Sequence, residues 1–383
     1  MNKRILGILL SITMVLAVVF VLLPGCTPSG TTPTSTATTP GGTTTAPSTQ
    51  PPAQGEVKQW RCQTSFTTGS AGWWLYQEVA DRITEGTGGT LQVEMLPAGA
   101  IVGALEVCDA VSTGAIEMGY GCDGYWQGTN IAFAATGMFG AHMTWDEMIV
   151  WLYSDEVGGQ KISQDLFAKY GMMAFPMVLG TGEAAYMSNK PIVDISDYEG
   201  LAFRGMGWTG MIINEPEFSA AGTMIAPGDV YTSLERGVID ACELGSPVGN
   251  WSMGIHEVTK YMGFPGVHQL TQVQNLLINM DSWNELTDAE KIVVQLACEA
   301  SNNRSWAFNI WGSAAILPDY IDYGTEILSL SPECQGTWRD VSWRLADEQA
   351  AQSADFKKVW DAQRTMLETL RPYLVLQTPD WGD

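Results

Sequence analysis

The spacing of hydrophobic positions predicts helices that alternate with strands from about residue 57 onward. Residues 75–83 carry apolar side chains at helical spacing, a glycine pair at 88–89 stops that helix, and residues 91–95 then alternate as in a half-buried strand. Strand, helix and strand in this order predict an α/β fold with a largely parallel sheet.

A helical pattern followed by a glycine and a strand occurs twice in the chain. Residues 107–118 place Gly114 between a helix and a short apolar run, and residues 230–241 place Gly237 in the same position. The match predicts two lobes built on the same α/β plan. Ligands of such sheets bind beyond the carboxyl ends of the strands, so we expect a binding site in a cleft between the lobes.

One predicted helix is unusually long. Thr287–Glu290 has the sequence of a capping box, and the apolar residues that follow at helical spacing include Ile292, Val293, Leu296 and Ala297. The pattern meets no glycine before Gly312 and no proline before Pro318. A helix of about 25 to 30 residues would be on the order of 40 Å long. We expect it to brace both lobes.

The first residues are typical of an exported lipoprotein. Lys3 and Arg4 precede an apolar run at residues 5–23, which ends in Pro-Gly-Cys at Cys26. We expect residues 1–26 to be a lipoprotein signal peptide with Cys26 lipidated. An uncleaved membrane anchor is the alternative, since the run is just long enough to span a bilayer. Residues 27–56, rich in Thr, Pro and Ser, are expected to form a disordered tether.

Composition narrows the classes of function. The chain has 42 Asp and Glu against 19 Lys and Arg, a formal net charge of −23, and this acidic balance excludes nucleic acid as a partner. Seven cysteines include no CxxC pair, so structural zinc and dithiol redox sites have no local signature. The six cysteines other than Cys26 can form three disulfides in an exported protein or remain free thiols, and spacing leaves both open.

Four segments together resemble the solute receptors of tripartite ATP-independent periplasmic (TRAP) transporters. They are residues 97–119, 190–205, 233–243 and 257–269, and the resemblance extends over nearly all of residues 57–370. The Tyr125-Trp126 pair and the Phe-Pro-Gly-x-His string ending at His268 are most similar to the branch that binds 2-oxo or 2-hydroxy monocarboxylates with a metal ion.

The resemblance implies a two-lobed periplasmic-binding-protein fold with hinge strands and a long helix spanning both lobes. Lobe 1 would comprise residues 57–180 plus about 272–383, with the C-terminal helices, and lobe 2 residues 181–271. The receptor would close over a small organic acid at the outer face of the cytoplasmic membrane, held there by its lipid anchor. It would deliver the acid to a small and a large integral-membrane subunit, without catalysis.

Arg204 is the candidate carboxylate ligand. It ends a short predicted strand, with Gly205 and Gly207 beside it to let a ligand approach the backbone. Its planar fork can hold a carboxylate through two parallel hydrogen bonds. The matching arginine of the family is the carboxylate clamp; an ordinary surface arginine paired with an acid is the alternative.

The resemblance also implies a metal site formed by Glu243, the carbonyl of Leu244, Glu183 and Asn275. Leu244 stands where a tryptophan is usual, Glu183 where a glutamine is usual, and Asn275 where an acid is usual. These exchanges keep oxygen donors, which suit Na⁺ or Ca²⁺. Two acids in one closed cleft repel each other unless a cation lies between them, which favours Ca²⁺ over Na⁺, or else an ammonium group on the ligand.

Aromatic residues are candidate walls of the site. Tyr125 and Trp126 would line the cleft and orient the ligand, with core packing as the alternative, and Trp208 would be either wall or helix packing. A cysteine hydrolase built on Cys242 is the enzyme alternative, but no histidine lies near it in the sequence. A sensory module, or a receptor for a dicarboxylate, a sugar acid or an amino acid, also stays open.

Overall fold

The computed structural model describes residues 56–137 and 142–377. The expected signal peptide with Cys26 and the tether up to residue 55 lie outside these ranges. Within the described ranges, no helix is both long enough and apolar enough to cross a membrane.

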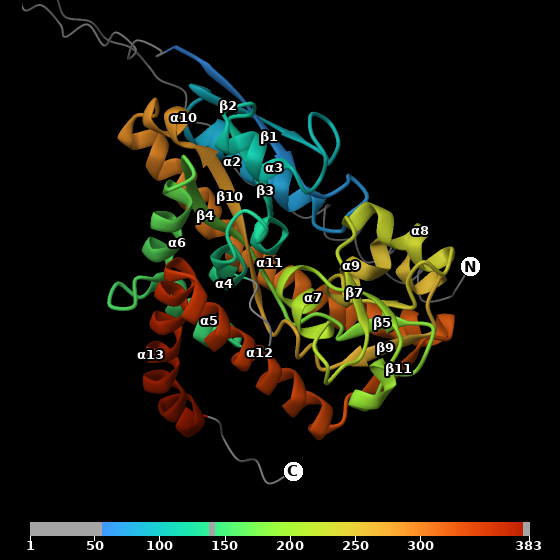
Figure 1. The fold of residues 1–383 in the computed structure, drawn as a ribbon. Helices are drawn as coiled ribbons and strands as arrows, with labels where there is room; N and C mark the ends of the chain where they lie inside the picture. The colour runs from blue at the N-terminus through green and yellow to red at the C-terminus, as the bar shows by residue number, and fades with distance from the viewer. Residues whose placement is uncertain (1–55, 138–141, 378–383) are drawn as a thin grey trace, which may run out of the picture. The chain divides into compact units, whose positions relative to one another are not determined.

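Two mixed β-sheets organise the described part of the chain (Figure 1). The first sheet has the strand order β2-β1-β3-β10-β4, and the second has the order β11-β9-β5-β8-β6-β7. The strands of the first sheet are β1 Lys58–Thr64, β2 Leu91–Leu96, β3 Met118–Cys122, β4 Met172–Gly180 and β10 Gln272–Asn279. Those of the second are β5 Tyr186–Ser188, β6 Ala202–Arg204, β7 Ala221–Thr223, β8 Ala241–Cys242, β9 Tyr261–Phe264 and β11 Glu326–Ser329.

The expected largely parallel sheet is wrong in one respect, because each sheet contains a strand that is antiparallel to both of its neighbours. In the first sheet this strand is β10, and in the second it is β5. The reason is the path of the chain, which leaves the first sheet through β4, enters the second through β5, and returns from β9 into β10. Residues 181–185 and 265–271 are therefore two crossover segments between the sheets.

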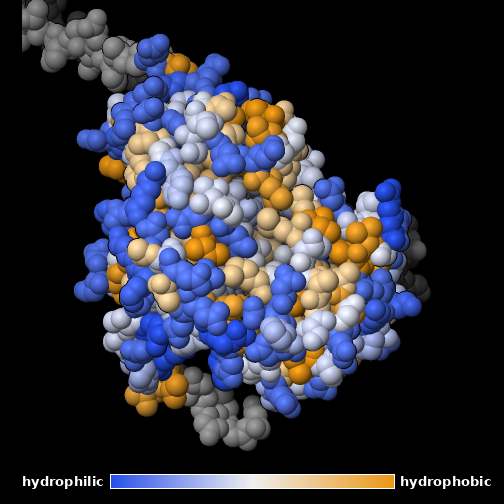
Figure 2. All heavy atoms as spheres, in the orientation of Figure 1, coloured by the Kyte–Doolittle hydropathy of each residue, from blue (hydrophilic) through white to orange (hydrophobic). Residues whose placement is uncertain are grey.

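Helices cover both sheets. Hydrophobic side chains of the first sheet face α2 and α11 on one side and α3, α4 and α6 on the other. The helices are α2 Trp73–Gly86, α3 Val107–Ser112, α4 Ala132–Gly137, α5 Trp145–Tyr153, α6 Gly159–Ala168, α7 Gly207–Ile213, α8 Val230–Glu235, α9 Pro247–Ser252, α10 Met280–Asn284, α11 Asp288–Tyr323, α12 Pro332–Gln352 and α13 Ala354–Gln377. Short 3₁₀ turns are η1 Asp123–Trp126, η2 Ile195–Tyr198, η3 Pro227–Asp229 and η4 Ile255–Glu257. Hydrophilic residues cover most of the face shown in Figure 2, with hydrophobic patches between them.

The repeated unit seen in the sequence is confirmed. Gly114 follows α3 with φ +74°, and Gly237 follows α8 with φ +68°. In both units two successive amides donate to one helix carbonyl, that of Ala110 in the first and that of Ser233 in the second. A left-handed conformation at this place favours glycine, which explains why the same residue ends both helices.

The long helix is confirmed and exceeds its expected length. Helix α11 has 36 residues, which corresponds to about 54 Å, and it passes both Gly312 and Pro318 before ending at Gly324. Near its middle Asn302 donates to the Pro176 carbonyl of β4, and near its end the Tyr320 hydroxyl donates to the Pro247 carbonyl of α9. The helix thus contacts elements associated with both sheets.

Two of the apolar residues at helical spacing in α11 face outward. Ile292 and Leu296 are 57% and 56% exposed, whereas Val294 and Cys298 are buried. The lobe boundaries remain a prediction. The strands of the first sheet lie within residues 58–180 and 272–279, and those of the second within 186–264 except for β11, which pairs with β9.

The six described cysteines are free thiols and all are buried. Of the two alternatives left open by their spacing, the structure has the reduced one. They are Cys62, Cys108, Cys122, Cys242, Cys298 and Cys334.

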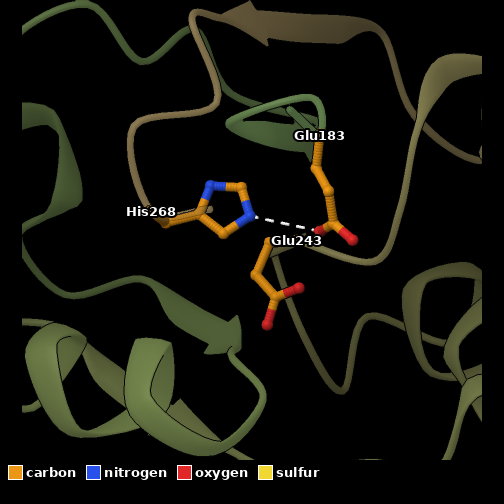
Figure 3. A group of neighbouring side chains, drawn as sticks. All are labelled: Glu183, Glu243 and His268. Atoms are coloured by element: carbon orange, nitrogen blue, oxygen red, sulfur yellow. Dashed lines mark hydrogen bonds and ion pairs between the residues drawn. The ribbon is translucent and has the colours of Figure 1, made fainter. Parts of the chain in front are cut away.

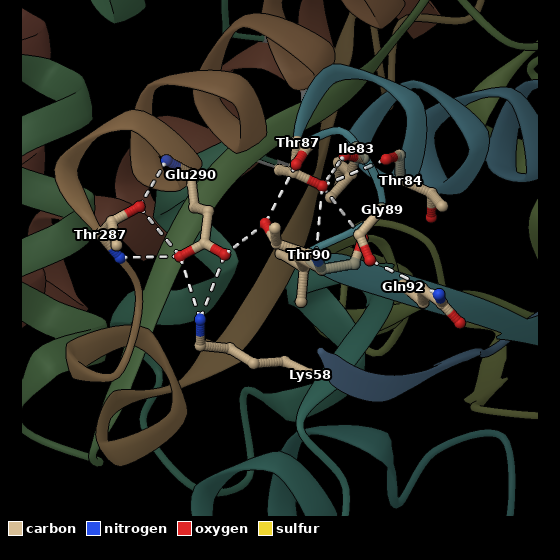
Figure 4. Close-up of polar contacts among 10 residues, drawn as sticks. Lys58, Ile83, Thr84, Thr87, Gly89, Thr90, Gln92, Thr287 and Glu290 are labelled. Atoms are coloured by element: carbon tan, nitrogen blue, oxygen red, sulfur yellow. Dashed lines mark hydrogen bonds and ion pairs between the residues drawn. The ribbon is translucent and has the colours of Figure 1, made fainter. Parts of the chain in front are cut away.

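A buried carboxylate fastens the start of α11 to the first sheet (Figure 4). Glu290 accepts hydrogen bonds from Lys58 of β1 at 3.1 Å, from the Thr90 hydroxyl at 2.8 Å and from the Thr287 backbone at 2.8 Å. Burial acts to raise the pKa of Glu290, but these donors outweigh it and lower the pKa from 4.5 to about 2. Ionised Glu290 therefore stabilises the fold.

We predict that Glu290→Gln lowers the free energy of unfolding by about 2 to 3 kcal/mol at pH 7, since hydrogen bonds to a charged group are lost. Because the folded pKa lies below the ordinary value, the contribution is full above about pH 4.5 and is lost as the pH falls toward about 2. Urea unfolding at several pH values measures it. The exposed Asp319→Asn on the same helix is the control, and an equal effect of both substitutions would refute the assignment.

Candidate functional site

Arg204 and Glu243 meet at the carboxyl ends of two adjacent parallel strands. Arg204 is the last residue of β6, Glu243 directly follows β8, and β6 pairs with β8 so that Arg204 lies opposite Cys242. The backbone N–H of Glu243 also donates to the Arg204 carbonyl at 3.1 Å. Parallel pairing thus places a cation and an anion side by side at one edge of the sheet, as expected for a ligand site in this type of fold.

The pair is buried, and one guanidinium nitrogen of Arg204 takes no part in it. Arg204 Nη1 lies 3.1 Å from Glu243 Oε2, both side chains are 1% exposed, and Arg204 Nε donates to the Ile225 carbonyl at 3.2 Å. The Met206 backbone N–H donates to the second oxygen of Glu243. Arg204 Nη2 is buried and has no hydrogen-bond partner among the described residues. An unpaired guanidinium nitrogen is costly to bury, so it points to an anionic ligand.

Burial and neighbouring charges oppose each other at this pair. Burial acts against the charged guanidinium, but the carboxylate of Glu243 beside it raises the pKa of Arg204. Burial also raises the pKa of Glu243, the charge of Glu183 adds to the rise, and Arg204 opposes it. Glu183 therefore lies close enough to Glu243 for the two acids to repel each other.

Glu183 and His268 come from the two crossover segments and meet between them (Figure 3). His268 Nε2 lies 3.2 Å from Glu183 Oε2. The other oxygen of Glu183 accepts hydrogen bonds from the side-chain amides of Gln269 at 3.0 Å and Gln272 at 2.7 Å. The two amides hold Oε1 of Glu183, so that Oε2 faces the imidazole of His268.

Glycine lets the two crossover segments approach this closely. A Cβ added to Gly266 would lie 2.1 Å from the carbonyl oxygen of Glu183, a distance that no side chain tolerates. The backbone N–H of Glu183 donates to the Gln269 carbonyl at 3.3 Å across the same contact. Any residue other than glycine at 266 would separate His268 from Glu183.

Three possible metal ligands converge here. Glu183, Glu243 and His268 each offer one donor atom, and these atoms all lie within 4.8 Å of one another (Figure 3). All three side chains are buried. Two carboxylate oxygens and an imidazole nitrogen are suitable ligands for a cation, and the repulsion between the two acids favours one.

Tyr125 and Trp126 lie on the turn η1 directly after β3. Gly207, with φ +49°, approaches this turn so closely that an added Cβ would lie 2.9 Å from the Gly124 carbonyl oxygen. Burial raises the pKa of Tyr125, Glu243 adds to the rise and Arg204 opposes it, which places the phenol within electrostatic range of the buried pair. Trp126 is 3% exposed, and its indole nitrogen has no partner among the described residues.

Two of the expected site residues have other contacts. The Trp208 indole N–H donates to Ser342 Oγ at 2.9 Å, and its ring stacks on Phe356 with centroids 5.4 Å apart. Its side chain therefore packs among α7, α12 and α13. Asn275 donates to Asp123 Oδ2 at 2.6 Å, which commits its amide nitrogen and leaves only its oxygen for an ion.

Leu244 borders a cavity of about 90 Å³ beside the cluster. Its lining includes Phe66, which follows β1, Gln272 of β10, and residues of the segment 244–253 that follows β8. Gln272 touches both the cavity and Glu183, so the cavity adjoins the cluster.

In the sequence His268 stood out only as part of a motif, and Gln269 and Gln272 were not predicted as partners of Glu183. The available signal was Gly266 within the Phe-Pro-Gly-x-His string, because an isolated glycine marks a close backbone approach. Nothing in the sequence names Glu183 as the residue approached.

The chain is similar in sequence to known solute-binding proteins. Residues 75–353 match the DctP model, described as bacterial extracellular solute-binding protein, family 7. A monocarboxylate 2-oxoacid-binding periplasmic protein from Nostoc sp. is 27% identical over 309 residues, which make up 79% of this chain and 82% of that protein.

Solved structures share the fold. A TRAP transporter solute-binding protein from Bordetella bronchiseptica with copurified calcium and picolinate has a TM-score of 0.80 at 22% identity, covering 84% of this chain and 95% of that one. One from Pseudoalteromonas atlantica with bound sodium and pyruvate has a TM-score of 0.78 at 21% identity, covering 85% of this chain and all of that one (100%). The chain adopts the two-lobed α/β fold of these proteins and belongs to the DctP family of bacterial extracellular solute-binding proteins.

Proposed function

We propose that this chain is the solute receptor of a TRAP transporter, and that it binds a small 2-oxo or 2-hydroxy monocarboxylate and delivers it to membrane permease subunits. The observation that carries the proposal is the buried Nη2 of Arg204, which lacks a partner among the described residues beside the cluster of Glu183, Glu243 and His268. The relative from Nostoc sp. is named for binding monocarboxylate 2-oxoacids, which supports the same ligand class here.

In this proposal the carboxylate of the ligand accepts hydrogen bonds from Arg204, and a cation held by the two acids would offset their charge and polarise the ligand oxygens. Glu183, Glu243 and His268 would hold the ion, with the Leu244 carbonyl and the Asn275 oxygen as further donors. The buried donor set fits such an ion, since oxygen-rich sites suit Na⁺ and Ca²⁺. Tyr125 and Trp126 would close one side.

Charge favours a divalent ion. A histidine that binds a metal ion does so in its neutral form. The two carboxylates therefore outweigh Arg204 by one negative charge, and a monocarboxylate adds another. A divalent cation brings the assembly to neutrality, whereas Na⁺ leaves one negative charge buried, which is costly in a closed site.

We also propose that the site performs no catalysis. The thiol next to it is a poor nucleophile, because burial raises the pKa of Cys242 to about 12. A receptor binds its ligand and releases it unchanged, so none of the other groups in the site has to act as a catalytic base.

Arg204→Ala is predicted to weaken binding of pyruvate by about 2 to 5 kcal/mol, because it removes the charged partner of a buried carboxylate. Arg204→Lys should recover only part of the affinity, since a point charge does not replace the planar fork. Isothermal calorimetry measures both, with the exposed Arg236→Ala as control and thermal unfolding to verify folding. Unchanged affinity in the Ala variant would remove Arg204 from the site.

Glu183→Gln is predicted to change which cation supports binding. In the chelated wild type we expect pyruvate to bind at least about tenfold more tightly with added Ca²⁺ than with Na⁺, and the variant should reduce that ratio because it carries one negative charge less. Calorimetry in the two salts measures the ratio. Full affinity of the chelated protein without added metal would contradict the ion model, and tight binding of an amino acid there would indicate a ligand ammonium group instead.

We further propose that Cys26 is lipidated and anchors the receptor at the outer face of the membrane through the tether. Cys26→Ala is predicted to leave the precursor unacylated, because the thiol that carries the lipid is gone. Mass spectrometry of the membrane fraction measures this. A wild-type protein that is never acylated would favour the uncleaved anchor.

A further inference from the structure

The cavity of about 90 Å³ adjoins the cluster through Leu244 and Gln272. The ligand's carboxylate is assigned to Arg204, and the chain continues from Glu243 directly into Leu244, which lines the cavity. Gln272 of β10 donates to Glu183 and also lines the cavity. The tail of a bound acid, which is the part beyond its C2 oxygen, would then lie in this space.

The polar side chains that line the cavity are mostly paired with one another. Gln274 donates to Gln272 at 2.9 Å and accepts from the Tyr120 hydroxyl, while Gln272 donates to Glu183. Ser246 donates to Asn309 at 2.8 Å. The Ser252 hydroxyl donates to the Gly249 carbonyl at 2.8 Å, and the Tyr76 hydroxyl interacts with those of Tyr120 and Ser70. Few polar side chains of the lining are therefore left to bind a ligand.

The rest of the lining is hydrophobic and uncharged. No described residue around the cavity is a Lys, Arg, Asp or Glu, and its apolar walls come from Phe66, Leu75, Val178, Leu244, Met253 and Phe308. A second carboxylate in this space would be buried without a partner, and a row of sugar hydroxyls would find few acceptors. An ammonium group would likewise lack a counterion there.

The volume sets the size of the tail. One water molecule needs about 10 to 15 Å³ of such space, so a cavity of about 90 Å³ has room for about six atoms of that size. A methyl group, as in pyruvate, would leave most of it unfilled, and unfilled apolar space forfeits packing.

We infer that the ligand is a monocarboxylate with a branched or cyclic apolar tail, and that Leu244 is the residue that selects it. This inference rests on the proposed function and narrows its substrate class, since it disfavours the dicarboxylate and sugar-acid alternatives. Leu244 is only partly buried, and it lines the cavity directly after Glu243 in the chain.

The test is a calorimetric panel of pyruvate, 4-methyl-2-oxovalerate and 2-oxoglutarate with Ca²⁺ present. In the wild type the branched acid should bind at least about tenfold more tightly than pyruvate, and 2-oxoglutarate no more tightly than pyruvate. Leu244→Trp, which fills the cavity, should bring the ratio of the first two affinities to about one. Ile292→Trp, on the exposed face of α11, should keep the wild-type ratio.

Two outcomes would overturn the inference: a wild type that binds pyruvate as tightly as the branched acid, or an unchanged ratio in Leu244→Trp. If that variant fails to fold, Leu244→Ala takes its place, and it should raise the relative affinity for the larger phenylpyruvate because it deepens the cavity. An unchanged relative affinity there would overturn the inference too. Failure of every acid to bind, pyruvate included, refutes the proposed function itself, whereas pyruvate binding without preference refutes only the tail assignment.

Discussion

The site depends on the close approach of two crossover segments, 181–185 and 265–271. At their contact the backbone of Gly266 lies against the carbonyl of Glu183, where a methyl group would come within 2.1 Å of the oxygen. This contact brings His268 and Glu183 together although they belong to connections running in opposite directions between the sheets. A ligand bound here touches the segments that join the two sheets, which is where closure of a hinged receptor would be sensed.

An acidic protein that binds an anion must do so locally. The net charge of −23 repels carboxylates at a distance, but the buried Arg204 acts in a medium where water does not screen it. Glu243 stabilises that charge and at the same time occupies one nitrogen of the guanidinium group. Nη2 has no partner among the described residues, so it is the nitrogen left to bind the carboxylate of a ligand. Selection therefore comes from a few buried groups rather than from the overall field.

The features that could be predicted from the sequence are those that depend on a local pattern of residues. Arg204 and Glu243 were predictable because polar residues after parallel strands gather at one edge, and the helix–glycine–strand repeat was predictable because φ is positive at Gly114 and Gly237. The antiparallel β5 and β10, the passage of α11 through Pro318 and the role of His268 were not, because each depends on contacts between residues far apart in sequence. Tyr320, for example, anchors the end of α11 to the Pro247 carbonyl.

The ion cluster and the tail cavity are not independent parts of the site. Gln272 donates to the carboxylate of Glu183 with its nitrogen and accepts from Gln274 with its oxygen, and Gln274 accepts in turn from Tyr120. One wall of the cavity is thus the same hydrogen-bonded chain that orients a proposed metal ligand. Because each amide is fixed by its neighbours, a tail that displaced Gln272 would also turn Glu183. Size selection in the cavity and ion binding at the head of the ligand are therefore coupled through one side chain.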